Sequence, residues 1–526
     1  MKAKAHRPSS PRKTRLNPSR TRAGNGNGAS APLAPTVSAS PELAAWLSKP
    51  KQNLIGGKWV PAASGKSFDV FNPADGSVLA RAAEGEGEDI NRAVSAARRA
   101  FNGAAWRQMT PSERGKLIWR IGDLILENAD ELAELESLDN GKPRAVARAA
   151  DVPLAADLFH YMAGWTTKIE GQTIPISVPR FHAFTLREPV GVVGQIIPWN
   201  FPLLMAAWKL GPALATGNCV VLKPAEQTPL TALRLGELLL QSGLPEGVVN
   251  IITGFGETAG AALAGHDDVD KIAFTGSTEV GKIIVRAAAG NLKKVSLELG
   301  GKSPNIVFRD TPDLDAAING AASAIFFNHG QCCCAGSRLM VERDVFDTVV
   351  AGVAAHAKRI KLGPGLSADT EMGPLVSDEQ LQRVTSFMNQ GKQAGACYLA
   401  GGSRKGSQGY FVEPTVIKDV KPDMSVVREE IFGPVVVAES FSDVDDLVRR
   451  ANQTPYGLAA GVWTRDLAKA HRIAAELKAG TVWLNCYNIF DAALPFGGYK
   501  QSGWGREMGH EVLNLYTQTK AVVAAL

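Results

Sequence analysis

The sequence has no run of 18 or more uninterrupted apolar residues, so we expect no transmembrane helix and no membrane partner. It has only six cysteines in 526 residues, and no two of them form a Cys-x-x-Cys pair. This usage argues against a zinc or disulfide-exchange site and suits a reducing compartment. We therefore expect no metal site.

Acidic residues are absent from residues 1–40, which hold eight Lys and Arg. The rest of the chain carries 49 basic and 52 acidic residues, so its near-neutral balance gives no electrostatic case for nucleic-acid binding. The segment 1–48 is rich in Pro, Ser, Gly and Asn, which predicts a disordered basic tail. A transit peptide is the alternative, because the segment is Arg-rich and acid-free. We expect a cytoplasmic protein, or a mitochondrial one if the alternative holds.

The pattern of the remaining chain predicts a mixed α/β fold. Helical periodicity is present in 88–101 and 112–138, after a strand and turn at 53–60. From about residue 190, short β-rich runs alternate with helical segments, which is typical of βαβ units and a parallel sheet. A second α/β series spans about 303–480. We expect an outward hairpin at 171–189 and an edge strand at the C-terminus.

Two glycine-rich loops are candidates for binding a dinucleotide. GFGETAG (254–260) nearly matches the dinucleotide fingerprint, but it also fits a simple strand–helix turn. FTGSTEVG (274–281) follows an apolar strand, and Ser277 can cap the next helix beside a phosphate. We prefer the second loop.

LKPAEQTP (222–229) places Lys223 and Glu226 at the end of another strand, where α/β folds bind ligands. A carboxylate there can accept hydrogen bonds from ribose hydroxyls and would repel a 2′-phosphate. This favours NAD over NADP, although a solvated charge pair would give the same pattern.

Three further segments contain candidate catalytic groups. FFNHGQCCCAGSR (326–338) contains three consecutive cysteines, of which one could be a nucleophile and at least two are expected to pack as small hydrophobes. LELGGKSPN (297–305) places Glu298 in an apolar strand, where a raised pKa suits a general base. PWNFP (198–202) offers the Asn200 amide in a rigid turn as an oxyanion donor.

Together these segments resemble the aldehyde dehydrogenase superfamily, and most closely its NAD-dependent class that oxidises aldehydes to carboxylic acids. The resemblance spans roughly residues 50–526 in order. It implies Cys333 as the nucleophile, Glu298 as the general base and Asn200 as the oxyanion amide. It also implies a proton relay through Lys209 and Glu507. The implied cofactor-binding residues are Ile196, Ile197, Pro198, Trp199, Lys223, Glu226, Gly256, Phe274, Gly276, Ser277, Val280, Leu299, Glu430 and Phe432.

The resemblance further implies a Rossmann-like NAD-binding domain formed by residues 49–170 and 190–301, and an α/β catalytic domain at 302–498. Segments 171–189 and 499–526 would form a small β oligomerisation arm of a homodimer or homotetramer. His329 departs from the family pattern, which often has Gln there. It could be a neutral structural variation or could tune the neighbouring cysteines electrostatically.

The aldehyde is expected to be apolar, either aliphatic or arylalkyl such as phenylacetaldehyde. The side chains that match the family's substrate tunnel are Phe201, Leu204, Trp208, Phe327, Phe490 and Phe496, although some of these could instead be core packing. A specialised arylacetaldehyde dehydrogenase is the alternative. A CoA-acylating enzyme is disfavoured because Glu298 is a hydrolytic base, and a non-enzymatic structural protein on the same fold is a remote alternative.

Overall fold

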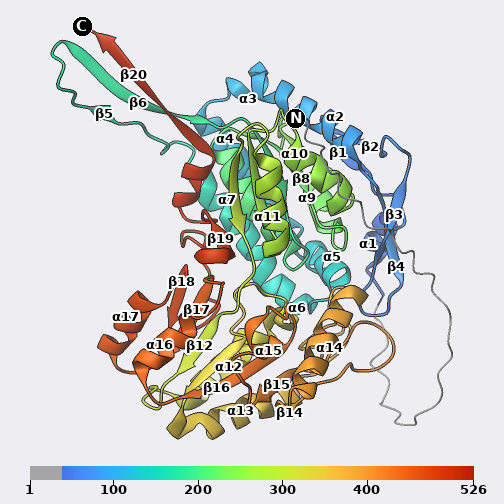
Figure 1. Ribbon diagram of the computed structural model, residues 1–526. Coiled ribbons are helices and arrows are strands. Elements are labelled where there is room, and N and C mark those ends of the chain that lie inside the picture. Colours follow the sequence, from blue (N-terminus) through green and yellow to red (C-terminus); the bar gives the residue numbers. More distant parts are fainter. Residues whose placement is uncertain (1–37) are drawn as a thin grey trace, which may run out of the picture. The chain divides into compact units, whose positions relative to one another are not determined.

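Five parallel strands form the centre of an eight-stranded sheet in the computed structural model, which describes residues 38–526 (Figure 1). The strand order is β19-β11-β10-β7-β8-β9-β1-β2, and the outer strands β19, β1 and β2 pair antiparallel. The bounds are β1 Asn53–Ile55, β2 Lys58–Val60, β7 Val192–Ile196, β8 Cys219–Lys223, β9 Val249–Ile251, β10 Lys271–Thr275, β11 Lys294–Glu298 and β19 Gly503–Trp504. Every residue of β7, β8 and β10 is buried, as expected of a parallel sheet that helices cover on both faces.

The second α/β series forms a separate seven-stranded sheet in the order β14-β15-β16-β13-β12-β17-β18, antiparallel only between β14 and β15. Its strands are β12 Pro304–Val307, β13 Arg338–Glu342, β14 Cys397–Ala400, β15 Thr415–Lys418, β16 Val435–Phe441, β17 Ala459–Trp463 and β18 Thr481–Leu484. The predicted mixed α/β fold with parallel sheets is therefore confirmed.

The predicted hairpin and C-terminal strand are also confirmed. Strands β5 (Thr173–Ile174), β6 (Phe181–Pro189) and β20 (Thr517–Ala525) form a three-stranded antiparallel sheet, with β20 at one edge. This arm projects away from the two larger sheets, and the chain ends at its tip (Figure 1). The segment 499–526 was expected to belong to this arm. Its residues 503–504 instead form β19, which pairs with β11 at the edge of the first sheet. Strands β3 (Ser67–Phe71) and β4 (Val78–Ala83) form a two-stranded sheet.

The helices fill the segments between these strands. The α-helices are α1 Pro41–Leu47, α2 Gly87–Asn102, α3 Ala104–Arg107, α4 Pro111–Glu127, α5 Ala129–Asn140, α6 Arg144–Val146, α7 Val152–Ala163, α8 Pro202–Ala215, α9 Leu230–Gln241, α10 Ala261–Gly265, α11 Thr278–Ala288, α12 Leu314–Phe326, α13 Phe346–Arg359, α14 Asp378–Gln393, α15 Ser425–Arg428, α16 Val444–Asn452 and α17 Leu467–Glu476. The π-helical segments are η1 Ala147–Asp151 and η2 Gly256–Gly260, and the 3-10 segments are η3 Phe327–Gly330, η4 Arg343–Val345, η5 Lys500–Ser502 and η6 Glu511–Leu515.

Two sequence predictions about helices need correction. The continuous helix expected over 112–138 is two helices, α4 and α5, which are separated by Asn128 in a non-helical conformation. The tail predicted over 1–48 ends too late, because 41–47 forms α1, whose Leu43 and Leu47 are buried against β3 and β4 residues in one hydrophobic cluster. Pro41 at the first helical position favours this start. The rest of that prediction, residues 1–37, lies outside the described residues.

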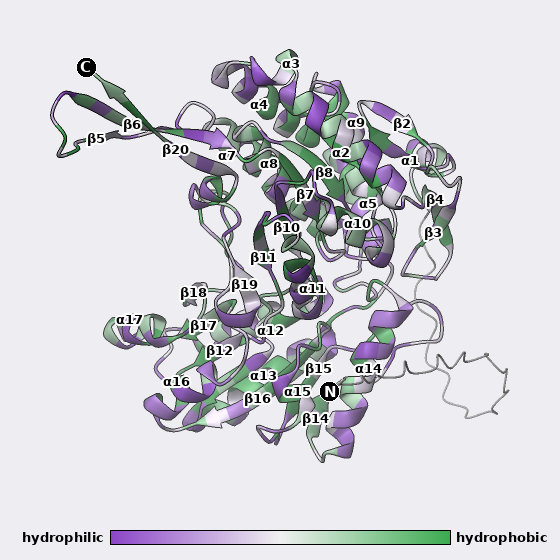
Figure 2. Ribbon diagram, turned by 45° about the horizontal axis from the view of Figure 1, so that its top comes forward, coloured by the Kyte–Doolittle hydropathy of each residue, from purple (hydrophilic) through white to green (hydrophobic). Residues whose placement is uncertain are grey.

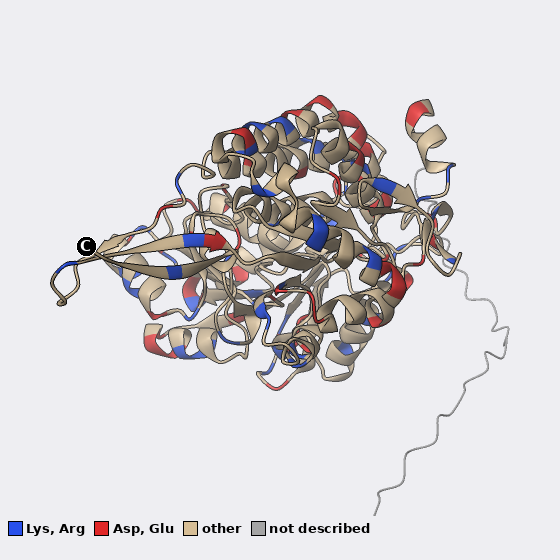
Figure 3. Ribbon diagram, turned by 90° about the horizontal axis from the view of Figure 1, so that it is seen from above, with Lys and Arg blue, Asp and Glu red and all other residues tan. Residues whose placement is uncertain are grey.

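Hydrophobic residues follow the inner strands, as the green colouring of β7 and β8 shows, while outer helices such as α14 carry purple, hydrophilic residues (Figure 2). Basic and acidic residues are interspersed over the helices seen from above (Figure 3). Within residues 38–526, no helix combines the length and the apolar character needed to cross a bilayer.

Candidate active site

A cavity of about 350 Å³ lies where the loops after β7, β10 and β11 meet segments of the second sheet. Among the predicted site residues, those that line it are Pro198, Trp199, Asn200, Phe201, Leu204, Trp208, Gly276, Ser277, Glu298, Leu299, Phe327, Cys333, Glu430, Phe432, Phe490 and Phe496. The predicted residues that do not line it are Ile196, Ile197, Lys209, Lys223, Glu226, Gly256, Phe274, Val280 and Glu507.

The three consecutive cysteines differ in exposure. Cys332 and Cys334 are 6% and 1% exposed, and their sulfur atoms lie 3.4 Å apart, whereas Cys333 is only partly buried. Side-chain hydrogen bonds with Cys333 and Cys334 lower the pKa of Cys332. The hydrogen bond with Cys332 is in turn the largest cause that raises the pKa of Cys333 and of Cys334. All three cysteines line the cavity, and Cys333 is the most exposed of them.

Asn200 lies in the turn that joins β7 to α8, one residue before Phe201, the N-cap of the helix that begins at Pro202. Its side chain is 4% exposed, and its amide nitrogen donates to the carbonyl of Gln331 over 3.0 Å. An amide NH₂ has two donors, so a second hydrogen remains for another acceptor. The amide is thus held beside the cysteine segment with donor capacity to spare.

Glu298 ends strand β11 and is 6% exposed. One of its carboxylate oxygens is buried with no hydrogen-bond partner. Burial, and then the nearby negative charge of Glu507, raise the pKa of Glu298 well above that of an ordinary carboxyl. A buried carboxylate with unused acceptor capacity can take a proton from water.

The two glycines after this strand allow a second carboxylate to approach. A Cβ at Gly300 would lie 2.2 Å from Glu430 Oε2, and the Gly301 N–H donates to Glu430 Oε1 over 2.8 Å. Burial raises the pKa of Glu430 to about 7. Only residues without a side chain fit at Gly300, which explains the Gly-Gly of the LELGGK segment.

Lys209 and Glu507 form a buried ion pair, with 2.5 Å between Lys209 Nζ and Glu507 Oε1. The pair lies outside the cavity lining, yet its charges act on Glu298 in opposite directions: Glu507 raises and Lys209 lowers the pKa of Glu298. The pair is therefore electrostatically coupled to Glu298 from behind the cavity wall.

The loop FTGSTEVG lines the cavity, whereas Gly256 of GFGETAG does not. Ser277 caps α11 by accepting the Val280 N–H over 3.2 Å, and Thr275 has a buried hydroxyl with no partner. These groups form a polar rim at a helix N-terminus, a place that suits an anionic ligand.

Lys223 and Glu226 form an ion pair over 2.9 Å at the carboxyl end of β8. Lys223 is buried and Glu226 is partly exposed. Phe432, in a left-handed conformation with φ 60°, places its ring edge-on to Trp199 with the ring centroids 5.2 Å apart.

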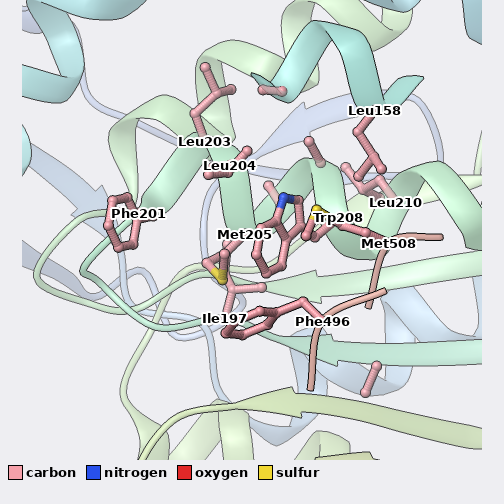
Figure 4. Packing of buried hydrophobic residues seen from close by; sticks show 14 of the residues in the cluster. Leu158, Ile197, Phe201, Leu203, Leu204, Met205, Trp208, Leu210, Phe496 and Met508 are labelled. Carbon is pink, nitrogen blue, oxygen red and sulfur yellow. The ribbon is translucent and has the colours of Figure 1, made fainter. Parts of the chain in front are cut away.

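The predicted tunnel residues form an aromatic wall. Phe201 and Phe327 stack with centroids 6.1 Å apart, and Trp208 lies 5.5 Å from Phe496. Figure 4 shows Trp208 of α8 close to Phe496, which comes from a distant segment, with Leu204 on the same helix. Phe490 contacts both Trp208 and Phe496.

His329 is neutral in the fold. It is 1% exposed, and burial lowers its pKa to about 3. Its Nδ1 lies 3.3 Å from Gln331 Nε2, which donates to it. The lowered pKa leaves little positive charge on His329, and its contact with Gln331 favours the interpretation of His329 as a structural variation.

Several cavity residues were missed by sequence reasoning. Asp151 lines the cavity from the π-helical segment η1, and Gln380 and Arg383 line it from α14. No motif surrounds these positions. The π-helical turn that contains Asp151 is a feature often found at functional sites, but it is visible only in the structure.

A partly exposed thiol, a buried carboxylate and a side-chain amide meet at the edge of a parallel sheet, a combination that suits covalent catalysis. Comparison with known proteins identifies the class further. The model of the aldehyde dehydrogenase family matches residues 59–522. The chain belongs to this family, and the prediction of an oxidoreductase of this kind is confirmed.

The relatives match along nearly their whole length. Aldehyde dehydrogenase family 2 member B4, mitochondrial, of Arabidopsis thaliana is 54% identical over 476 residues, covering 90% of this chain and 88% of the relative. Benzaldehyde dehydrogenase, mitochondrial, of Antirrhinum majus is 53% identical over 474 residues, covering 90% of this chain and 88% of the relative. An NAD+ complex structure of aldehyde dehydrogenase from Bacillus cereus has a TM-score of 0.92 and 53% identity, covering 94% of this chain and all of that one.

Proposed function

We propose that the protein oxidises apolar aldehydes to carboxylic acids with NAD, through a covalent intermediate on Cys333. One observation carries this proposal: the Cys333 sulfur, the Asn200 amide and the Glu298 carboxylate all open onto one largely apolar cavity. The NAD+ complex of the Bacillus cereus relative supports NAD as the cofactor.

The residues at the cavity's polar rim fit this dinucleotide. Ser277 and the start of α11 would face its phosphates, and the unpartnered hydroxyl of Thr275 has a free hydrogen-bonding site there. Lys223 and Glu226 would hold the adenosine ribose, and Glu430 with Phe432 the nicotinamide end. When bound, the nicotinamide supplies the hydride acceptor.

The first step forms a bond between sulfur and carbon. The Cys333 thiolate attacks the aldehyde carbonyl carbon, and the carbonyl π electrons move to oxygen. The spare N–H of Asn200 and the Cys333 backbone N–H stabilise this oxyanion, where one donor typically contributes about 100- to 1,000-fold in rate.

After oxidation the acyl group is a thioester on Cys333. Glu298 removes a proton from water, the hydroxide adds to the thioester carbon, and the Cys333 thiolate leaves with the electrons of the C–S bond. Lys209 and Glu507 lie behind Glu298 and would pass that proton onward.

The aromatic wall supports aliphatic and arylalkyl aldehydes, including phenylacetaldehyde, and the benzaldehyde dehydrogenase relative supports aromatic ones. Asp151 also lines the cavity, but its carboxylate is paired with Lys142 over 2.7 Å. Apolar pockets discriminate weakly, by about 10- to 200-fold per methylene, so broad specificity is expected. The arm of β5, β6 and β20 would join copies of the chain as dimers or tetramers.

An aldehyde panel tests the proposal, with NAD or NADP, with or without CoA, and with reduced cofactor and acid measured. Wild-type protein should form NADH and free acid, prefer phenylacetaldehyde and hexanal to charged aldehydes, and make no acyl-CoA. Cys333→Ala should abolish turnover, while Cys332→Ala and Cys334→Ala serve as matched controls that retain it. Turnover by Cys333→Ala, or acyl-CoA as the product, would overturn the proposal.

A further inference from the structure

Three side chains converge on the main-chain carbonyl of Asn200. Asn328 Nδ2 donates to this oxygen over 2.9 Å, Lys142 Nζ over 3.3 Å and Asn140 Nδ2 over 3.4 Å. Asn140 ends α5, Lys142 follows it, and Asn328 lies just after α12. Three buried donors from two distant segments thus fix the position of this one carbonyl.

Lys142 is itself fixed in place. Its side chain is 1% exposed, and its ammonium group pairs with Asp151 over 2.7 Å and with Glu136 over 3.1 Å. It also lies 4.4 Å from the ring centroid of Phe201, the residue after Asn200. Because the Lys142 ammonium is buried and paired with two carboxylates, its position is fixed. Its hydrogen bond to the Asn200 carbonyl therefore restricts the position of the turn.

Asn328 connects the same carbonyl to the cysteine segment. Its amide nitrogen donates both to Asn200 O, over 2.9 Å, and to Gln331 O, over 3.1 Å. Gln331 O also accepts from Asn200 Nδ2 over 3.0 Å. Asn328 adopts a left-handed conformation, φ 47° and ψ 38°, that asparagine tolerates better than most residues. These bonds fix both the main chain and the amide plane of Asn200 relative to the segment bearing Cys333.

We infer that Asn328 and Lys142 are positioning residues for the oxyanion site: they hold the Asn200 amide at the place where charge develops. This inference rests on the proposed function, in which Asn200 stabilises the oxyanion. Neither side chain lines the cavity, so each is proposed to act by holding Asn200 and not by contact with the reacting atoms.

Asn328→Gly tests this role without adding backbone strain, because glycine accepts the left-handed conformation. Its kcat with aldehyde should fall about 10- to 100-fold, since misplacing a reacting group by about 1 Å can reduce the rate about 100-fold. Alkylation of Cys333 by iodoacetamide forms no oxyanion, so its rate, followed by peptide mass, should stay at the wild-type value. Asn485→Gly is the matched control: Asn485 is also left-handed, with φ 55°, and bonds to the backbone of Thr464.

A double-mutant cycle separates this inference from the proposed function. In an Asn200→Ala background, Asn328→Gly should reduce kcat by no more than about twofold, because the two changes act on one interaction. Losses that multiply would overturn the positioning role. An Asn200→Ala protein with wild-type kcat would instead overturn the oxyanion role itself.

Lys142→Met provides a second, independent test in the same kind of double-mutant cycle, and Lys293→Met is its control. Lys293 is also buried and donates to a single carbonyl, that of Ala264, over 3.0 Å. Lys142→Met should lower kcat when Asn200 is intact. In the Asn200→Ala background it should leave kcat unchanged. An equal loss in both backgrounds would mean that Lys142 acts elsewhere.

Discussion

At the scale of single residues, burial assigns roles to groups of the same chemical type. Glu298 and Glu430 both end in the cavity, but Glu430 accepts the Gly301 N–H while Glu298 keeps a carboxylate oxygen without a partner. A carboxylate that is already hydrogen-bonded is suited to binding, and one that is unpaired is suited to proton transfer. The same logic separates Cys333 from its two more buried neighbours.

The ion pair behind Glu298 predicts how the rate depends on pH. Glu298 acts as a base only when ionised, so hydrolysis is lost as pH falls through its raised pKa. Glu507→Gln removes a negative charge and should move this acid limb to lower pH. Lys209→Met removes a positive charge and should move the limb to higher pH. Steady-state kcat across pH measures both shifts, and limbs that stay in place in both variants would contradict the coupling.

At the scale of elements, short turns after parallel strands deliver the reacting groups. The turn after β7 carries Asn200, the loop after β10 carries Ser277, and β11 ends on Glu298. Because the carboxyl ends of parallel strands lie at one edge of a sheet, neighbouring strands bring these residues together. Their sequence separation therefore says little about their distance in space.

The β5–β6–β20 arm predicts self-association. Its exposed apolar side chains are between 38% and 59% exposed, and β20 has an unpaired edge. Those side chains are Ile174, Ile176, Val178, Phe181, Leu186 and Val523. Full burial of such a side chain contributes about 1.5–3 kcal/mol relative to full exposure, and these are already partly buried, so covering them would add only a part of that for each.

Replacing Val178, Phe181 and Val523 by Ser should therefore shift the protein from an oligomer to a monomer in light scattering. Leu467→Ser is the control, because Leu467 is 70% exposed on α17, away from the arm. If the triple variant keeps the wild-type mass, the arm is not the interface.

At the scale of the whole molecule, the sequence allowed the fold class, the arm and the motif-bearing segments to be predicted, because these depend on local pattern. The break at Asn128 was missed because hydrophobic periodicity continues across it. Asp151 and Arg383 reach the cavity only through tertiary packing, so no local signal marks them. The neutrality of His329 likewise depends on burial, which a neighbouring sequence does not reveal.

The choice among the three cysteines also shows what local sequence can predict and what only the structure adds. Local chemistry could not distinguish them, and the family resemblance selected Cys333. The structure adds a physical difference, since Cys333 is more exposed than Cys332 and Cys334.

The central claim is that Cys333 carries an acyl group that Glu298 helps to hydrolyse, and one measurement tests it directly. Glu298→Gln protein is mixed with NAD and phenylacetaldehyde, NADH is followed in a stopped flow, and the acylated peptide is identified by mass. We predict a burst of one NADH per site, slow turnover afterwards, and the acyl group on Cys333. Steady turnover near the wild-type rate, or an acyl group on Cys332 or Cys334, would contradict the claim.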